Sequence, residues 1–176
     1  MIKPITFCRN VRVILIPDGE PYTVVEGCVG YITQVLGGNW TVQLNDGRLV
    51  RVRGMDGDAI GEESLSPWTA ADDGDADEEG IWTRLRCIFD PEIPVNIVEL
   101  GLVYGLDLEE WTEGKAVVVT MTLTAPGCGM GQVLADDVRD AVCALPGVCR
   151  VNVDLVFEPP WTPERMTEAA RLELGF

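Results

Sequence analysis

The stretch with the clearest capacity for chemistry is TLTAPGCGMGQVLADDV, in which two glycines flank Cys128. A strand is predicted to end at Thr124 and a helix to begin near Met130 or Gly131, so Cys128 lies in the loop before the helix. Unpaired backbone N–H groups and the helix dipole favour an anion there, and therefore the thiolate form of Cys128. The flanking glycines leave the sulfur open to a metal or a partner. An average lone cysteine is a small buried core residue, but this combination of loop, glycines and helix start makes Cys128 the candidate site.

A second stretch, DPEIPVNIVELGLVYGL, places Asp90 and Glu92 on either side of a proline, between a predicted helix and a predicted strand. In one interpretation these carboxylates lie beside the Cys128 thiolate as metal ligands or hydrogen-bonding groups. In the other they form a rigid turn, with Asp90 capping the short turn over residues 96–100. The sequence favours neither.

The remaining cysteines give weaker signals. No two of the six cysteines have Cys-x-x-Cys spacing, and free thiols are expected rather than disulfides. Cys87 and Cys143 lie among apolar residues of predicted helices and Cys149 begins a predicted strand, so core packing is expected for all three. Trp161 in EPPWTPERM is predicted to anchor the last helix, with a partner surface as the alternative.

Composition excludes several classes of function. The chain has no histidine, which removes the commonest general base and every Ser–His or Cys–His pair. Its 13 Lys and Arg against 29 Asp and Glu give a net charge of −16, so nucleic acid and anionic membranes are not expected as partners. No apolar run reaches the roughly 18 residues of a membrane span. We therefore expect an acidic, cytoplasmic protein.

Residues 67–80 hold six acidic residues and no basic one, a composition that predicts a flexible linker. Residues 1–66 are predicted to form a small all-β domain, an SH3-like barrel, with turns at Gly37-Gly38 and Asp46-Gly47. Its predicted strands cover residues 11–15, 28–35, 39–44 and 49–53. The arginines of its last strand are expected on a solvated face; they are Arg48, Arg51 and Arg53.

Residues 81–176 combine helical and alternating periodicity in the order α-β-β-α-β-α. The strand–helix–strand part is expected to be parallel with a right-handed crossover. Thr162 and Pro163 are predicted to be the N-cap and first turn of the last helix. The whole chain is therefore expected to be α+β.

Three ordered motifs, DPEIPVNIVELGLVYGL, VVVTMTLTAPGCGM and EPPWTPERMTEAARLELGF, resemble the SufT branch of the iron–sulfur protein maturation family. The first segment is also similar to the N-terminal extension of SufT-type proteins, through IPDGEPYTVVEG and ITQVLGGNWTV. The resemblance implies a small α/β domain that assembles or delivers iron–sulfur clusters without turnover of its own. It also implies that the family's functional cysteine corresponds to Cys128, its acidic turn to Asp90 and Glu92, and its threonine before the cysteine loop to Thr124.

An iron–sulfur cluster needs about four ligands, usually thiolates, and Cys128 supplies one. The leading hypothesis is a maturation factor that holds a cluster transiently or shares it between the subunits of a homodimer. Client apoproteins and the cluster assembly machinery would be its partners. The alternatives are a metal-free adaptor that docks clients and an accessory subunit of an oxygenase system, as in the related PaaD proteins. An enzyme is disfavoured because no histidine can serve as a base for Cys128. The cluster type, and whether Cys128 binds metal or relays sulfur, stay open.

Overall fold

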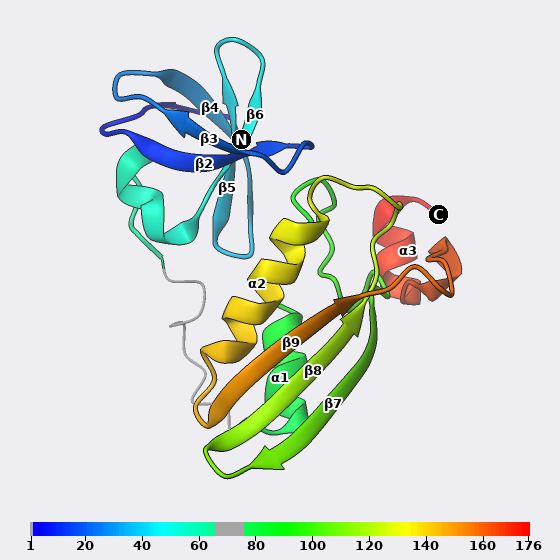
Figure 1. Cartoon of the computed structure of the whole chain (residues 1–176). Coiled ribbons are helices and arrows are strands. Elements are labelled where there is room, and N and C mark those ends of the chain that lie inside the picture. The colour runs from blue at the N-terminus through cyan, green and yellow to red at the C-terminus, as the bar shows by residue number, and fades with distance from the viewer. Residues whose placement is uncertain (1, 66–75) are drawn as a thin grey trace. The chain divides into compact units, whose positions relative to one another are not determined.

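The computed structural model describes residues 2–65 and 76–176, and the chain divides into two compact units, Met1–Ala71 and Asp72–Phe176 (Figure 1). Residues 67–75 of the predicted linker lie outside the described residues. The rest of that stretch belongs to the second unit, because helix α1 (Glu78–Leu85) begins within it and Ala76 is buried. The Asp77 carboxylate caps this helix by accepting a hydrogen bond from the Gly80 N–H at 2.7 Å, so the acidic residues that suggested a linker also start a helix.

The first unit is a six-stranded antiparallel sheet with strand order β1-β4-β5-β6-β2-β3, which confirms the all-β prediction. Its elements are β1 (Lys3–Thr6), β2 (Val11–Ile16), β3 (Pro21–Val24), β4 (Val29–Leu36), β5 (Asn39–Leu44), β6 (Leu49–Val52) and the 3₁₀ segment η1 (Gly54–Ile60). The two-residue turn between β4 and β5 has φ of +54° at Gly37 and +75° at Gly38, the backbone that a tight hairpin requires.

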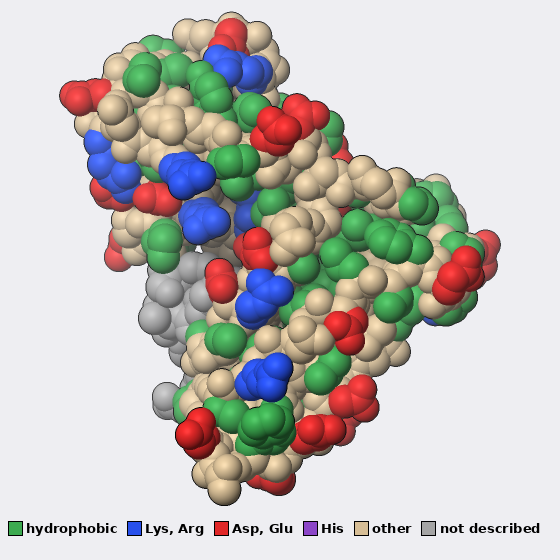
Figure 2. All heavy atoms as spheres, in the orientation of Figure 1, with side chains coloured by type: hydrophobic (Ala, Val, Ile, Leu, Met, Phe, Trp, Pro, Cys, Tyr) green, Lys and Arg blue, Asp and Glu red, His purple; other side chains and the backbone are tan. Residues whose placement is uncertain are grey.

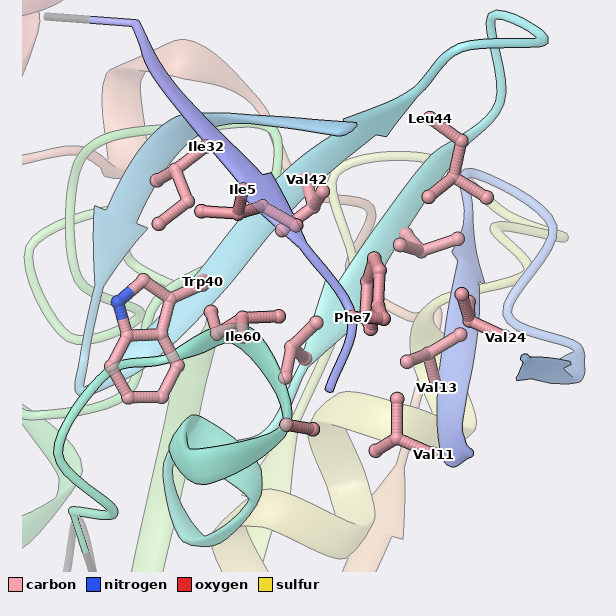
Figure 3. Close-up of a cluster of buried hydrophobic side chains, with 13 residues drawn as sticks. Ile5, Phe7, Val11, Val13, Val24, Ile32, Trp40, Val42, Leu44 and Ile60 are labelled. Carbon is pink, nitrogen blue, oxygen red and sulfur yellow. The ribbon is translucent and has the colours of Figure 1, made fainter. Parts of the chain in front are cut away.

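All six strands and η1 place apolar side chains in one core, so the sheet curls around a single cluster (Figure 3). Phe7, Val42 and Val50 are each 1% exposed or less. The expectation of a solvated arginine face is wrong for Arg51, which is buried. Alternation places the side chains of Val50 and Val52 in this core, but the short β6 strand also buries the residue between them.

The second unit is a three-stranded sheet with strand order β7-β8-β9, covered by helices. Its further elements are β7 (Val103–Trp111), β8 (Gly114–Met121), α2 (Gly131–Cys143), β9 (Val148–Leu155), the 3₁₀ turn η2 (Pro163–Arg165) and α3 (Glu168–Leu174). The β7 and β8 strands pair antiparallel, whereas β8 and β9 pair parallel with α2 as the crossover, as predicted. Helix α2 runs along β9 in Figure 1. Within the described residues, no helix is long and apolar enough to cross a bilayer.

The last helix starts later than the sequence predicts. Thr162 and Pro163 open only the short η2 turn, and Thr167 caps α3 by accepting the Ala170 N–H at 3.2 Å. The cause is a close approach across the fold: a Cβ on Gly101 would lie 2.3 Å from the Arg165 carbonyl oxygen. Because the chain packs against Gly101 at this point, the helix begins only after Met166, whose backbone is extended.

Candidate functional site

The cysteine loop joins the central strand β8 to α2 and holds its backbone in defined turns. Gly127 has a φ of +77°, and the Cys128 carbonyl accepts the Gly131 N–H at 3.1 Å at the start of α2. A Cβ on Gly131 would lie 2.5 Å from Leu123 Cδ1, so a glycine lets the helix start pack against the end of the preceding strand. This geometry confirms the predicted strand–loop–helix arrangement around Cys128.

The Cys128 side chain is half-buried, and its thiol is free. In the described part of the chain its sulfur has no hydrogen-bond partner, whereas the sulfurs of Cys87 and Cys149 lie 3.6 and 3.4 Å from the carbonyl oxygens of Thr83 and Lys115. The Thr122 hydroxyl, at the start of this loop, is buried without a hydrogen-bond partner. A partly accessible thiol with no internal partner is suited to an external one.

The other three cysteines of the second unit are exposed, so their predicted core packing is wrong. Cys87 lies beyond the end of α1, two residues after the buried Leu85 and outside the helix whose apolar face is buried. Cys143 is the last residue of α2 and follows the buried Val142, one step off the apolar stripe. Apolar neighbours in sequence suggested that these cysteines are buried. Their exposure depends instead on their position relative to the buried face of each helix.

The acidic turn contains two carboxylates in different environments. Asp90 is 5% exposed, and its Oδ1 accepts the Glu92 N–H at 2.8 Å. Burial raises the pKa of the Asp90 carboxyl above its ordinary value, while the N–H groups of Glu92 and Ile93 act in the opposite direction. The Glu92 side chain is exposed. The two residues thus have separate roles in the turn, one internal and one facing out.

The predicted capping role of Asp90 for residues 96–100 belongs instead to Asn96. Its Oδ1 accepts the N–H groups of Val98 and Glu99 at 3.1 and 3.0 Å. The Asp90 carboxylate instead bonds within its own turn, where it accepts the Glu92 N–H.

A pocket of about 310 Å³ brings part of the acidic turn together with part of the cysteine loop. We call it the α3 pocket, and its lining residues are Glu92, Ile93, Pro94, Leu100, Thr124, Trp161, Met166, Leu174 and Phe176. Two predicted site residues, Glu92 and Thr124, therefore share one pocket. Asp90 and Cys128 do not line it, although Cys128 follows Thr124 by four residues.

Sequence reasoning missed the apolar walls of this pocket. Trp161 does anchor the C-terminal segment, since its Nε1–H donates to the Leu100 carbonyl at 2.7 Å, and it also lines the pocket. The EPPWTPERM motif indicated that Trp161 anchors this segment, but the sequence did not indicate which distant turn accepts the hydrogen bond from the indole.

The described residues contain no cluster of three or more His, Cys, Asp or Glu side chains that could hold a metal ion. Cys128 is therefore not part of a group of three or more candidate metal ligands within the described residues. This donor set fits a shared cluster and does not fit a resident mononuclear metal held by one chain.

The family described as iron–sulfur cluster assembly protein matches residues 78–153, within the second unit. The Fe-S protein maturation auxiliary factor of Porphyromonas gingivalis is 50% identical over 56% of this chain and 91% of its own length. The chain belongs to the iron–sulfur cluster assembly protein family. The match spans α1, both strands of the β7–β8 hairpin, the cysteine loop, α2 and most of β9.

Two further relatives agree with this assignment. The Fe-S protein maturation auxiliary factor SufT of Staphylococcus aureus is 39% identical over 50% of this chain and 97% of its own length. A crystal structure of a DUF59 domain from Bacillus anthracis superposes with a TM-score of 0.50 at 37% identity, covering 56% of this chain and 92% of that domain. These relatives confirm the predicted resemblance to the SufT branch and the α+β fold.

Proposed function

We propose that this protein is an iron–sulfur cluster maturation factor that takes part in delivering clusters to client apoproteins, with Cys128 as the ligand it contributes. The observation that carries this proposal is the half-buried Cys128 thiol, without a hydrogen-bond partner in the described residues, in a fixed loop at the start of α2. The family assignment and the names of its relatives as maturation factors support it.

The cluster is cargo in this proposal. It needs about four ligands, and the cysteine loop offers one thiolate. The remaining positions are filled by a second subunit, by small thiols or by the client's own cysteines. A cluster held by an incomplete protein shell transfers readily, because the client's ligands replace exchangeable ones.

The neighbouring polar residues receive distinct roles. Thr124, in the loop that carries Cys128, and Glu92, in the acidic turn, both line the α3 pocket. Their side chains orient the cluster or the client's ligands. Asp90 is a positioning residue, since its carboxylate holds the Glu92 N–H. We propose that the protein acts without catalytic turnover: it has no histidine, and the Asp90 oxygen already accepts an internal hydrogen bond.

The test is anaerobic reconstitution followed by iron and acid-labile sulfide analysis, together with activation of an apo client enzyme that requires a [4Fe–4S] cluster. Cys128→Ala is expected to lose the cluster and client activation. The matched control is Cys87→Ala, an exposed cysteine of the same unit, which should behave as the parent protein.

The result also separates the alternatives. About half a cluster per chain, lost in Cys128→Ala, supports a cluster shared between two subunits. Client activation without any bound metal in the parent protein supports the adaptor. Unchanged cluster content and unchanged activation in Cys128→Ala would overturn the role of Cys128. Dependence of a single oxygenase on this protein, with no effect on other clients, would favour the accessory subunit.

A further inference from the structure

The α3 pocket is mainly apolar and holds one charged side chain. Large apolar groups from three separated stretches of chain form its walls; they are Ile93, Leu100, Trp161, Met166, Leu174 and Phe176. Figure 2 shows apolar side chains gathered over the α3 end of the second unit, with acidic side chains at the margin. On this surface Leu172 and Phe176 are 72% and 70% exposed. Exposed apolar area of this kind, rimmed by polar residues, is typical of an interaction site.

The pocket walls are held in place by hydrogen bonds between distant segments. Besides the bond from Trp161 to Leu100, the Thr167 N–H donates to the Glu99 carbonyl at 2.9 Å and the Tyr104 hydroxyl donates to the Pro159 carbonyl at 2.8 Å. These contacts hold residues 159–167 against the turn that follows Asn96 and against the start of β7. A pocket with fixed walls binds without the cost of ordering them.

The charge at the pocket favours a cationic partner. Glu92 is exposed, and its carboxylate forms no ion pair within the part of the chain that the structure describes. A shallow hollow that also includes Phe176 adds the carboxylates of Glu164 and Glu168, with Arg171 as its one basic residue. The whole chain carries a net charge of −16, which attracts basic partners and repels acidic ones.

We propose that the α3 pocket docks an extended peptide segment of a partner protein, with a large apolar side chain in the pocket and an adjacent lysine or arginine paired with Glu92. This inference rests on the proposed function and names the surface that holds a client or an assembly partner. Thr124 lines the pocket and belongs to the loop that carries Cys128. A segment bound there therefore keeps its parent protein close to the thiol that supplies the cluster.

The test uses the metal-free full chain and a fluorescein-labelled peptide of sequence Gly-Ser-Leu-Lys-Leu-Ser-Gly, with binding measured by fluorescence anisotropy. Two further peptides replace the lysine by glutamate or both leucines by serine. We expect the first peptide to bind and both others to bind at least about five-fold more weakly. The indole N–H signal of Trp161 in a proton–nitrogen NMR spectrum should shift only with the first peptide.

Variants of the protein test each half of the pocket. Glu92→Gln is expected to weaken peptide binding about two- to five-fold, as for loss of one exposed ion pair. It should also make the dissociation constant less dependent on salt concentration. Ile93→Ser should weaken binding about ten-fold by removing apolar contact. The matched controls are Glu113→Gln, an exposed acid in the β7–β8 turn, and Val25→Ser, an exposed apolar residue of the first unit. Both should bind as the parent protein does.

Equal binding of the lysine and glutamate peptides, or equal loss in Glu92→Gln and Glu113→Gln, would overturn the proposal. So would absence of binding by the first peptide, or self-association of the chain through this pocket that Ile93→Ser abolishes. Cys128→Ala should bind the peptide normally. The peptide experiment and the cluster experiment can therefore fail separately, which distinguishes an error in the docking surface from an error in the proposed function.

Discussion

The two units treat their polar side chains differently. In the first unit the Arg9 guanidinium donates to the carboxylates of Asp56 and Asp58 at 2.9 and 2.7 Å, and Arg48 pairs with Asp46 while lying over the Tyr22 ring. Its apolar residues from every strand meet in one core. These ion pairs and this core join residues of the first unit to one another and stabilise its own fold.

The second unit leaves groups available near one end of its sheet. The Cys128 sulfur has no hydrogen-bond partner in the described residues, and Glu92 has no ion pair there. Glu92 lines the α3 pocket, as does Thr124 from the loop that carries Cys128. Satisfied groups stabilise a fold, whereas groups left free at one place indicate where an external partner binds. The comparison therefore supports the proposal that the cluster ligand and the docking surface both belong to the second unit.

The largest expected effect is on the closed core of the first unit. Trp40 is 4% exposed, so Trp40→Ala should lower the free energy of unfolding by about 3–5 kcal/mol. Chemical denaturation followed by circular dichroism measures this change. Peptide binding at the α3 pocket should persist under native conditions. Loss of that binding in Trp40→Ala would break the division of roles between the units.

A smaller effect is expected where the second unit closes its pocket. Gly101 has a φ of +72°, and an added Cβ would meet the Arg165 backbone. Gly101→Ala should therefore lower the free energy of unfolding by about 2–3 kcal/mol, because backbone strain and a backbone clash combine. It should also displace the C-terminal segment. The matched control is Gly127→Ala, since Gly127 has a φ of +77° and open space around its Cβ position.

The control Gly127→Ala should lower the free energy of unfolding by about 1 kcal/mol, because backbone strain is its only cost. Peptide binding should fall in Gly101→Ala and persist in Gly127→Ala. Equal stability losses in the two variants would contradict the close approach to Arg165.

The element order was predictable from sequence because it depends on local signals. Glycine pairs fixed the hairpin between β4 and β5, and alternation followed by a helical stripe gave the parallel β8-α2-β9 unit. Strands β1 and β3 were missed: each is four residues long and contains a proline, Pro4 and Pro21, which weakens a strand signal. The β1 strand pairs with β4, which is distant in sequence, whereas β3 pairs with the adjacent β2, so only β1 depends on a long-range contact.

The candidate site was predictable only in parts. Cys128, Thr124 and the acidic turn could each be proposed from residue type and local context. The meeting of Glu92 and Thr124 at one pocket depends on residues 157–176, which close over a turn some 60 positions earlier through the bond from Trp161 to Leu100. No periodicity encodes that contact. The same long-range closure moved the start of the last helix from Thr162 to Thr167.

That displacement predicts a difference between two threonines. Thr167→Ala should lower the free energy of unfolding by about 1 kcal/mol, since it removes the side-chain cap that accepts the Ala170 N–H. Thr162→Ala, at the position that the sequence alone favours, should cost less, because Thr162 makes no capping hydrogen bond. Thermal denaturation of both variants checks the ranking. A larger loss of stability in Thr162→Ala than in Thr167→Ala would indicate that Thr162 caps the helix, as predicted from sequence.

At any single pH, the smallest change in the free energy of unfolding is expected for Asp90→Asn, because the amide oxygen can still accept the Glu92 N–H. Its effect is on the pH dependence of stability. Burial raises the folded-state pKa of Asp90, so the folded state binds this proton more tightly than the unfolded state. The contribution of Asp90 is therefore fully present below the unfolded pKa and is lost as the pH rises through the folded pKa.

Denaturation of the parent protein and Asp90→Asn at a series of pH values from 3 to 7 isolates this contribution, since all other titrating groups are shared. The parent protein should lose stability relative to the variant as the pH rises. A stability difference that grows in the opposite direction would mean that the N–H groups around Asp90 outweigh burial. Asp90 would then be a stabilising anion in the turn, and its role in positioning Glu92 would depend on its charge.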